Sequence, residues 1–153
     1  MTGNPLSPDT IAWGVVYKPA VVAPGQLYWQ CVVADGPMDI GGNISIFVDL
    51  WDEQGLRVVG VPVLFYWDDG DERKLTELKP GEGFAVDLPM FAGGHSYGVR
   101  VDDGTPSDDL FGFGLGKWVP HHAFRVTFRR MVAEVIAPPT EPSTITYART
   151  EIE

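Results

Sequence analysis

The sequence predicts an all-β protein in which two antiparallel sheets pack face to face. Apolar and polar residues alternate with a period of two along most of the chain, which is the pattern of half-buried strands. Clusters of Gly, Pro and Asp separate these stretches, and helical periodicity is almost absent. Because short strands recur without helices between them, we expect an antiparallel immunoglobulin-like or jelly-roll-like β-sandwich with extended arms at both ends.

The first half of the chain contains four expected strands. Residues 11–17 and 27–34 are the first two extended segments, and each ends at a Pro-containing turn. Residues 43–51 alternate most regularly, so that Ile44, Ile46, Val48 and Leu50 share one face, opposite Ser45, Phe47, Asp49 and Trp51. The turn at 52–55 then reverses the chain into residues 56–67, where Gly60 and Pro62 predict a bulge or bend.

The second half contains three shorter expected strands, a long loop and the strongest strand. Residues 73–78, 84–88 and 96–102 are the short strands, and residues 103–119 form a loop rich in Gly and Asp. Residues 121–131 alternate clearly, which places His122, Phe124, Val126 and Phe128 on the face that points to the core.

Three regions follow from this pattern. Residues 27–132 are the sandwich domain, and residues 1–26 are an N-terminal extended arm with four prolines. Residues 133–153 are a Pro-rich linker and a C-terminal extended arm, whose last part is strand-like. The 16 residues from Pro138 to Glu153 span roughly 50 Å when extended, which is enough to reach a neighbouring molecule.

Composition excludes several classes of function. Of 153 residues, 21 are acidic and 11 basic, and the formal charge is −10. Such a chain repels phosphate, so we expect no nucleic acid and no anionic membrane surface among its partners. The apolar runs fall far short of the roughly 20 residues of a membrane span, and the N-terminus lacks the features of a secretory signal. No cofactor is expected.

Two acidic clusters and one cysteine are the candidates for chemistry. Asp68, Asp69 and Asp71 are weak calcium candidates, because their spacing does not follow a calcium-binding loop, and a solvated hairpin tip is favoured. Asp108 belongs to a second cluster and is expected to cap a turn through its side-chain oxygen. Cys31 is expected to be a small buried side chain. The spacing of nucleophiles, bases and metal ligands predicts no enzyme.

Aromatic side chains outside the expected core predict a binding surface. Phe47, Asp49 and Trp51 share a strand face, and a ring beside a carboxylate is a usual arrangement for stacking a sugar and accepting its hydroxyl protons. The favoured alternative is that this face is covered by the N-terminal arm or by a second subunit, where Trp acts as an interface anchor. Trp118, in the long loop, is a similar candidate for glycan or interface binding.

Three short motifs in sequence order resemble a known module. They are Val-Asp-Leu-Trp-Asp-Glu-Gln-Gly within residues 43–55, Asp-Gly-Thr-Pro-Ser-Asp within 102–108, and His-His-Ala-Phe within 121–128. Together they resemble the β-sandwich accessory modules appended to bacterial cell-wall hydrolases. The resemblance covers about two-thirds of the chain, and it implies a non-catalytic role in binding carbohydrate or a surface.

These observations predict a non-enzymatic structural or interaction protein. The two arms favour a phage virion component, such as a capsid decoration, tail or fibre-associated protein, made in the host cytoplasm and assembled through the arms. Its partners would be neighbours in a homo-oligomer or virion lattice, with Ile145, Tyr147 and Ile152 as arm contacts. The alternative is a carbohydrate-binding accessory module of a cell-wall hydrolase system, located outside the cell or at its surface and contacting a surface glycan.

Overall fold

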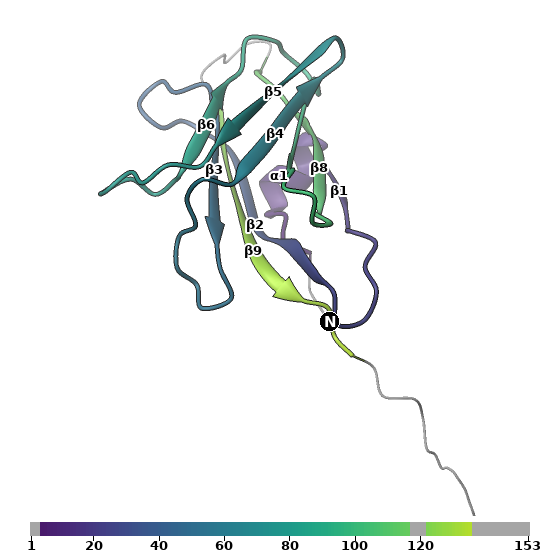
Figure 1. Cartoon of the computed structure of the whole chain (residues 1–153). Helices are drawn as coiled ribbons and strands as arrows, with labels where there is room; N and C mark the ends of the chain where they lie inside the picture. The colour runs from purple at the N-terminus through teal and green to yellow at the C-terminus, as the bar shows by residue number, and fades with distance from the viewer. Residues whose placement is uncertain (1–3, 117–121, 136–153) are drawn as a thin grey trace, which may run out of the picture.

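The computed structural model describes residues 4–116 and 122–135, and the predicted all-β sandwich is confirmed (Figure 1). One sheet has the strand order β1-β8-β7-β4-β5, and the other has the order β2-β9-β3-β6. The elements are α1 (Pro8–Trp13), β1 (Val16–Lys18), β2 (Leu27–Met38), β3 (Ser45–Trp51), β4 (Pro62–Trp67), β5 (Gly70–Leu75), β6 (Val86–Pro89), β7 (Tyr97–Val101), β8 (Asp109–Phe113) and β9 (Ala123–Val132).

The core lies between the two sheets and follows the predicted alternation. The side chains that β3 contributes to the core are Ile46, Val48 and Leu50, and those that β9 contributes are Phe124, Val126 and Phe128. These two strands are neighbours and run parallel, with Ile46 opposite Phe124, whereas the other pairings between named strands are antiparallel. Burying both alternating stripes against the five-stranded sheet supplies most of the apolar contact that holds the layers together.

The prediction of an extended N-terminal arm is wrong for residues 4–26, which pack on the sandwich. Ser7 caps α1 by accepting a hydrogen bond from the Thr10 amide, and Pro8 follows it at the first helical position. The Thr10 hydroxyl donates to the carbonyl of Gly36 at 2.6 Å, and Leu6 joins the core. Residues 11–13 are therefore helical, so the strand predicted over 11–17 is reduced to β1.

The long edge strand β2 is sealed by other parts of the chain. Its Ala34 exchanges two backbone hydrogen bonds with Pro5 and Ser7, and its Trp29 exchanges two with Pro106 and Asp108. An exposed strand edge invites pairing with another chain, and these contacts remove that edge at both points. The loop predicted over 103–119 also contains β8, which pairs with β1 and β7.

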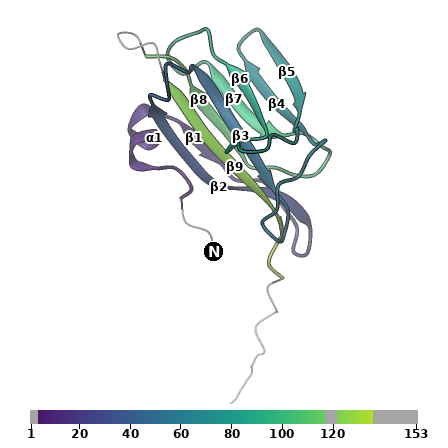
Figure 2. The ribbon, with the colours of Figure 1, turned by 90° about the vertical axis from the view of Figure 1, so that its left-hand side faces the viewer.

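The two flanks of the sandwich differ. Where β1 and β2 end the two sheets, α1 covers the gap and packs against β2. At the opposite flank, β5 and β6 are the last strands of their sheets, and no helix of the described residues lies there (Figure 2). One flank of the core is thus closed by the N-terminal segment, and the other is bounded by two edge strands.

Candidate functional site

The predicted binding face lies on the outer side of the four-stranded sheet. Phe47, Asp49 and Trp51 alternate on β3 with the core residues, and all three point away from the core. The expected cover of this face was an arm or a second subunit. The cover comes instead from the same chain, since Arg57 and the loop between β5 and β6 lie over Asp49.

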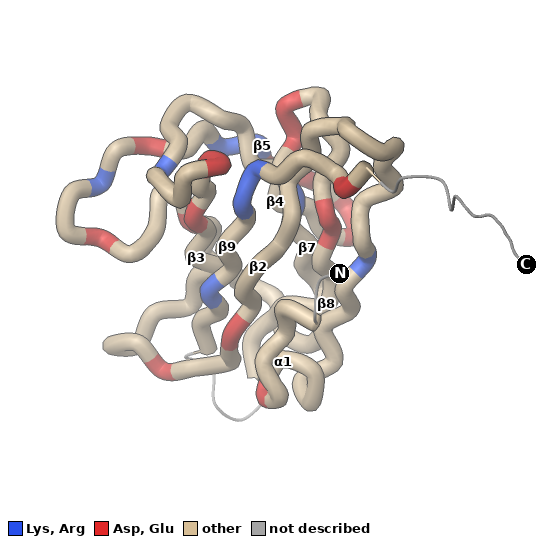
Figure 3. The backbone as a smooth tube through the Cα atoms, turned by 90° about the horizontal axis from the view of Figure 1, so that it is seen from below, with Lys and Arg blue, Asp and Glu red and all other residues tan. Residues whose placement is uncertain are grey.

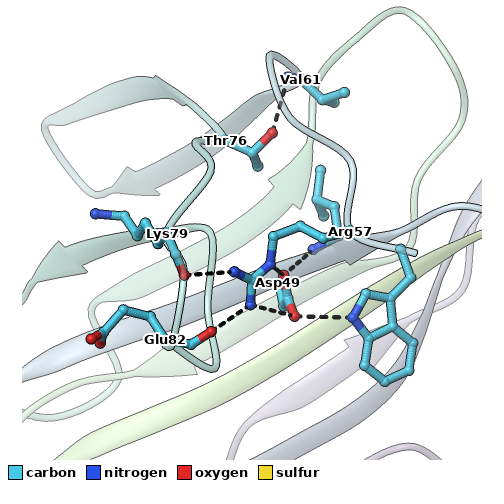
Figure 4. Close-up of polar contacts among 8 residues, drawn as sticks. Asp49, Arg57, Val61, Thr76, Lys79 and Glu82 are labelled. Atoms are coloured by element: carbon cyan, nitrogen blue, oxygen red, sulfur yellow. Dashed lines mark hydrogen bonds and ion pairs between the residues drawn. The ribbon is translucent and has the colours of Figure 1, made fainter. Parts of the chain in front are cut away.

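Asp49 is the centre of a closed polar network (Figure 4). The guanidinium of Arg57 donates to both carboxylate oxygens, with Nε to Oδ1 at 2.8 Å and Nη2 to Oδ2 at 3.2 Å. The indole Nε1 of Trp51 donates to Oδ2 at 3.0 Å, and the backbone N–H of Leu50 donates to Oδ1 at 3.1 Å. Asp49 itself is only 7% exposed. Both oxygens are therefore occupied by structural donors.

Arg57 extends this network to the loop between β5 and β6. Its Nη1 donates to the carbonyl of Lys79 at 3.2 Å, and its Nη2 donates to the carbonyl of Glu82 at 2.8 Å. A bidentate pair between guanidinium and carboxylate is among the strongest polar contacts in proteins. This pair fastens two loops to β3, and that is the role which the geometry gives Asp49.

Beside the network, the same face is hollowed. Phe47 and Phe84 pack with ring centroids 4.6 Å apart and line a hollow of about 210 Å³ together with Asn43 and the exposed Arg125. Gly83 leaves room for the guanidinium, because a Cβ there would lie 3.2 Å from Nη1 of Arg125. Within residues 4–116 and 122–135, no carboxylate forms an ion pair with Arg125.

This hollow combines an aromatic wall with a cation, Arg125, and a carboxylate, Glu82. Basic positions follow β9 (Figure 3), whereas the acidic Asp35 on β2 is the cross-strand partner of Arg125 and Glu82 also lines the hollow. An arginine beside apolar rings suits a ligand with a carboxylate and an apolar surface. Phe47 was predicted from the sequence and Arg125 was not, although the register of the neighbouring strands β3 and β9 places the two residues opposite each other.

The other predicted site residues are not brought to this hollow. Trp51 is partly exposed, and its indole is tied to Asp49. Asp68 and Asp69 lie in the turn between β4 and β5, and Asp71 lies on β5. In the described part of the chain, no three His, Cys, Asp or Glu side chains are placed to hold a metal ion. Trp118, Ile145, Tyr147 and Ile152 lie outside the described residues.

Asp108 has a larger structural role than the turn cap predicted for it. Its carboxylate is 1% exposed and accepts hydrogen bonds from the Tyr17 hydroxyl at 2.8 Å, the Ala20 amide at 2.7 Å and the Cys31 amide at 2.9 Å. It therefore joins the N-terminal segment, β2 and the start of β8. Burial and the Asp108 carboxylate raise the pKa of the Tyr17 hydroxyl above its usual range.

The same carboxylate acts on the single cysteine. Cys31 is 3% exposed, and burial together with the charge of Asp108 raises the pKa of its thiol above its ordinary value. Reactive cysteines need a stabilised thiolate, and both the burial of Cys31 and the charge of Asp108 disfavour the thiolate. The expectation of a small buried side chain is confirmed.

Comparisons of the chain with protein-family models, curated proteins and solved structures give no match. The fold defines its class as a β-sandwich domain, and the resemblance to hydrolase accessory modules stays a prediction. Among the described residues, no helix has the length and apolar character needed to cross a membrane.

The residues of the Thr-Pro-Ser-Asp motif make structural contacts. Pro106 and Asp108 form backbone hydrogen bonds with Trp29, and the hydroxyl of Ser107 accepts a hydrogen bond from the Val101 amide.

Proposed function

We propose that the chain is a non-enzymatic structural protein of a phage virion, a capsid decoration, tail or fibre-associated component that assembles with copies of itself. Because residues 4–26 pack on their own sandwich, the C-terminal segment is the arm left for assembly. Its Ile145, Tyr147 and Ile152 supply the apolar contacts, and its length is enough to reach a neighbour. A virion location follows from this role.

The observation that carries the proposal is an apolar cluster at the end of β9. Leu27, Val132 and Val135 are 43%, 55% and 70% exposed. Leu27 and Val132 are cross-strand partners, and Val135 lies beside Gly25, where a Cβ would meet it at 3.7 Å. We call these three residues the terminal apolar cluster. Contiguous exposed apolar side chains mark interaction surfaces, and this cluster lies where the chain leads into residues 136–153.

Val132→Asp is expected to weaken self-association of the whole chain by about tenfold or more, because it places a charge in the apolar contact. The change should leave the unfolding midpoint nearly unaltered, since Val132 is 55% exposed. Molar mass across a concentration series, measured by light scattering after gel filtration, checks this result.

Leu78→Asp is the matched control, because Leu78 is 75% exposed and lies in the loop between β5 and β6, outside the terminal apolar cluster. Its oligomer should match that of the unaltered chain. A monomeric unaltered chain at every concentration, or equal losses in the two variants, would be inconsistent with this proposal.

A carbohydrate-binding accessory module is the second candidate, and the hollow beside Phe47 favours it. The rings of Phe47 and Phe84 offer an apolar wall, and Arg125 offers a cation for a sugar carboxylate. The ligand of this module would be a cell-wall glycan, in which muramic acid carries such a carboxylate.

Under this candidate, Arg125→Ala should abolish calorimetric binding of the N-acetylglucosamine–N-acetylmuramic acid disaccharide. Arg73→Ala should leave it unchanged, because Arg73 lies on β5 and pairs with Asp102. Absence of binding by the unaltered chain, or retention of binding by Arg125→Ala, would reject the glycan candidate and leave the assembly proposal as it stands.

A further inference from the structure

The flank between β5 and β6 contains a second hollow, formed at the open side of the core. Two adjoining cavities of about 290 and 270 Å³ share Trp67 and Tyr97 as walls. Trp67 ends β4 and Tyr97 begins β7 in one sheet, and Leu88 lines the same space from β6 in the other. The hollow therefore opens between the two layers of the sandwich, and we call it the flank hollow.

The walls of the flank hollow are held in place. The hydroxyl of Tyr97 accepts hydrogen bonds from the amides of Phe91 and Ala92 at 2.9 and 3.0 Å, which fixes the loop after β6. Phe91 is 81% exposed at the rim, so its ring is available to a partner. Trp67 packs on Gly70, where a Cβ would lie 3.0 Å from the indole nitrogen, so the glycine leaves space for that ring.

The strands beside the flank hollow offer backbone as well as side chains. β5 and β6 are the outer strands of their sheets at this flank. Lys74 closes one point of the gap by donating to the carbonyl of Asp87 at 2.6 Å. Within residues 4–116 and 122–135, β5 has one strand partner, β4, which leaves its outer edge able to pair with an extended segment.

Charge indicates which partner fits. The residues that line the flank hollow include the exposed carboxylates of Asp68, Asp69 and Glu72 and, within the described chain, no Lys or Arg. A second copy of this chain, with its formal charge of −10, is a poor occupant of an acidic rim. A cationic segment is attracted by the carboxylates of the rim, and an apolar side chain buries its surface against Trp67 and Phe91.

We propose that the flank hollow binds an extended segment of another protein that carries an apolar side chain between lysines or arginines. The apolar side chain enters between Trp67 and Phe91, the cationic side chains pair with Glu72 and the Asp68–Asp69 turn, and the backbone runs along β5. Apolar anchors flanked by complementary charge are the usual basis of affinity and specificity in such contacts. This site is separate from the terminal apolar cluster.

The test uses the whole chain and a synthetic peptide in which lysine and threonine alternate around a central leucine. Calorimetry should detect binding that weakens with salt. Phe91→Ser should weaken it about tenfold or more by removing an apolar wall of the site, and Glu72→Gln should weaken it and reduce its dependence on salt. Both residues are exposed, so both variants are expected to fold.

Leu78→Ser, which removes an exposed apolar side chain away from the flank hollow, should bind as the unaltered chain does. A peptide with serine in place of leucine should bind much more weakly. Equal binding of the two peptides, equal loss in Leu78→Ser and Phe91→Ser, or absence of binding would overturn the proposal. Binding of a neutral oligosaccharide that Phe91→Ser abolishes, without peptide binding, would also overturn it and assign the site to sugars.

Discussion

Asp108→Ala is expected to lower the free energy of unfolding by about 3 kcal/mol or more, because the carboxylate is buried and accepts three hydrogen bonds. The variant leaves the amides of Ala20 and Cys31 without their acceptor and removes the contact that ties Tyr17 and Ala20 to β2, whereas the contacts of Pro5, Ser7 and Thr10 with β2 remain. Denaturant unfolding measures the loss. Reaction of the native protein with a thiol reagent should also accelerate, since Cys31 loses both its cover and the negative charge that raises its pKa.

Asp102→Ala is the control for this change, because Asp102 forms a surface ion pair with the exposed Arg73. Exposed ion pairs contribute little to the free energy of unfolding, so Asp102→Ala should lower it by less than about 1 kcal/mol. Equal stabilities of Asp108→Ala and Asp102→Ala would show that the Asp108 contacts do not hold the N-terminal segment in place.

Arg57→Ala is expected to destabilise the fold by about 3 kcal/mol, since it leaves the carboxylate of Asp49 without its cation. The carbonyls of Lys79 and Glu82 lose their donor in the same variant, so the loop between β5 and β6 should loosen. Chemical unfolding measures the stability, and amide hydrogen exchange over residues 76–85 measures the loosening.

Replacing both members of the pair provides the control. A double variant, Asp49→Leu with Arg57→Met, removes the unpaired charge and should recover part of the lost stability, because the cost lies largely in an uncompensated buried carboxylate. The loss of stability in the double variant is compared with the sum of the losses in the two single variants. If the two values are equal, Asp49 and Arg57 do not act as a pair, and the network has been misassigned.

Much of the body of the fold was predictable because its strands alternate locally. Burial of Ile46, Val48 and Leu50 on β3, and of Phe124 and Phe128 on β9, follows from a period of two without any knowledge of partners. The parallel pairing of β3 with β9 was not predictable, because strand order depends on contacts between residues about eighty positions apart.

The N-terminal segment shows where local reading failed. The helix α1 is too short for its periodicity to be visible, and its signal was the pair Ser7 and Pro8, which sequence analysis interpreted as part of an extended arm. Leu6 is buried because its neighbours Pro5 and Ser7 hydrogen-bond to the edge of β2, and Thr10 is buried because its hydroxyl donates to the carbonyl of Gly36. Both contacts depend on residues far away in the sequence. Strand β8 was missed because its Gly and Asp neighbours are typical of loops.

The candidate site was predictable in part. The shared face of Phe47, Asp49 and Trp51 follows from alternation, but its cover by Arg57 does not, because a loop's position over a sheet is set by long-range contacts. For the same reason Arg125 joins Phe47 only through strand register. The flank hollow unites residues of β4, β6 and β7, and nothing in the local sequence of Trp67 indicates that it faces Leu88.

Sedimentation velocity can show whether the chain assembles through its C-terminal segment. The whole chain is compared with a chain that ends at residue 137, over the same concentrations. We predict that the whole chain forms a larger species and that the shorter chain sediments as a monomer with the same unfolding midpoint. Equal sedimentation of the two chains, or unfolding of the shorter one, would contradict the account.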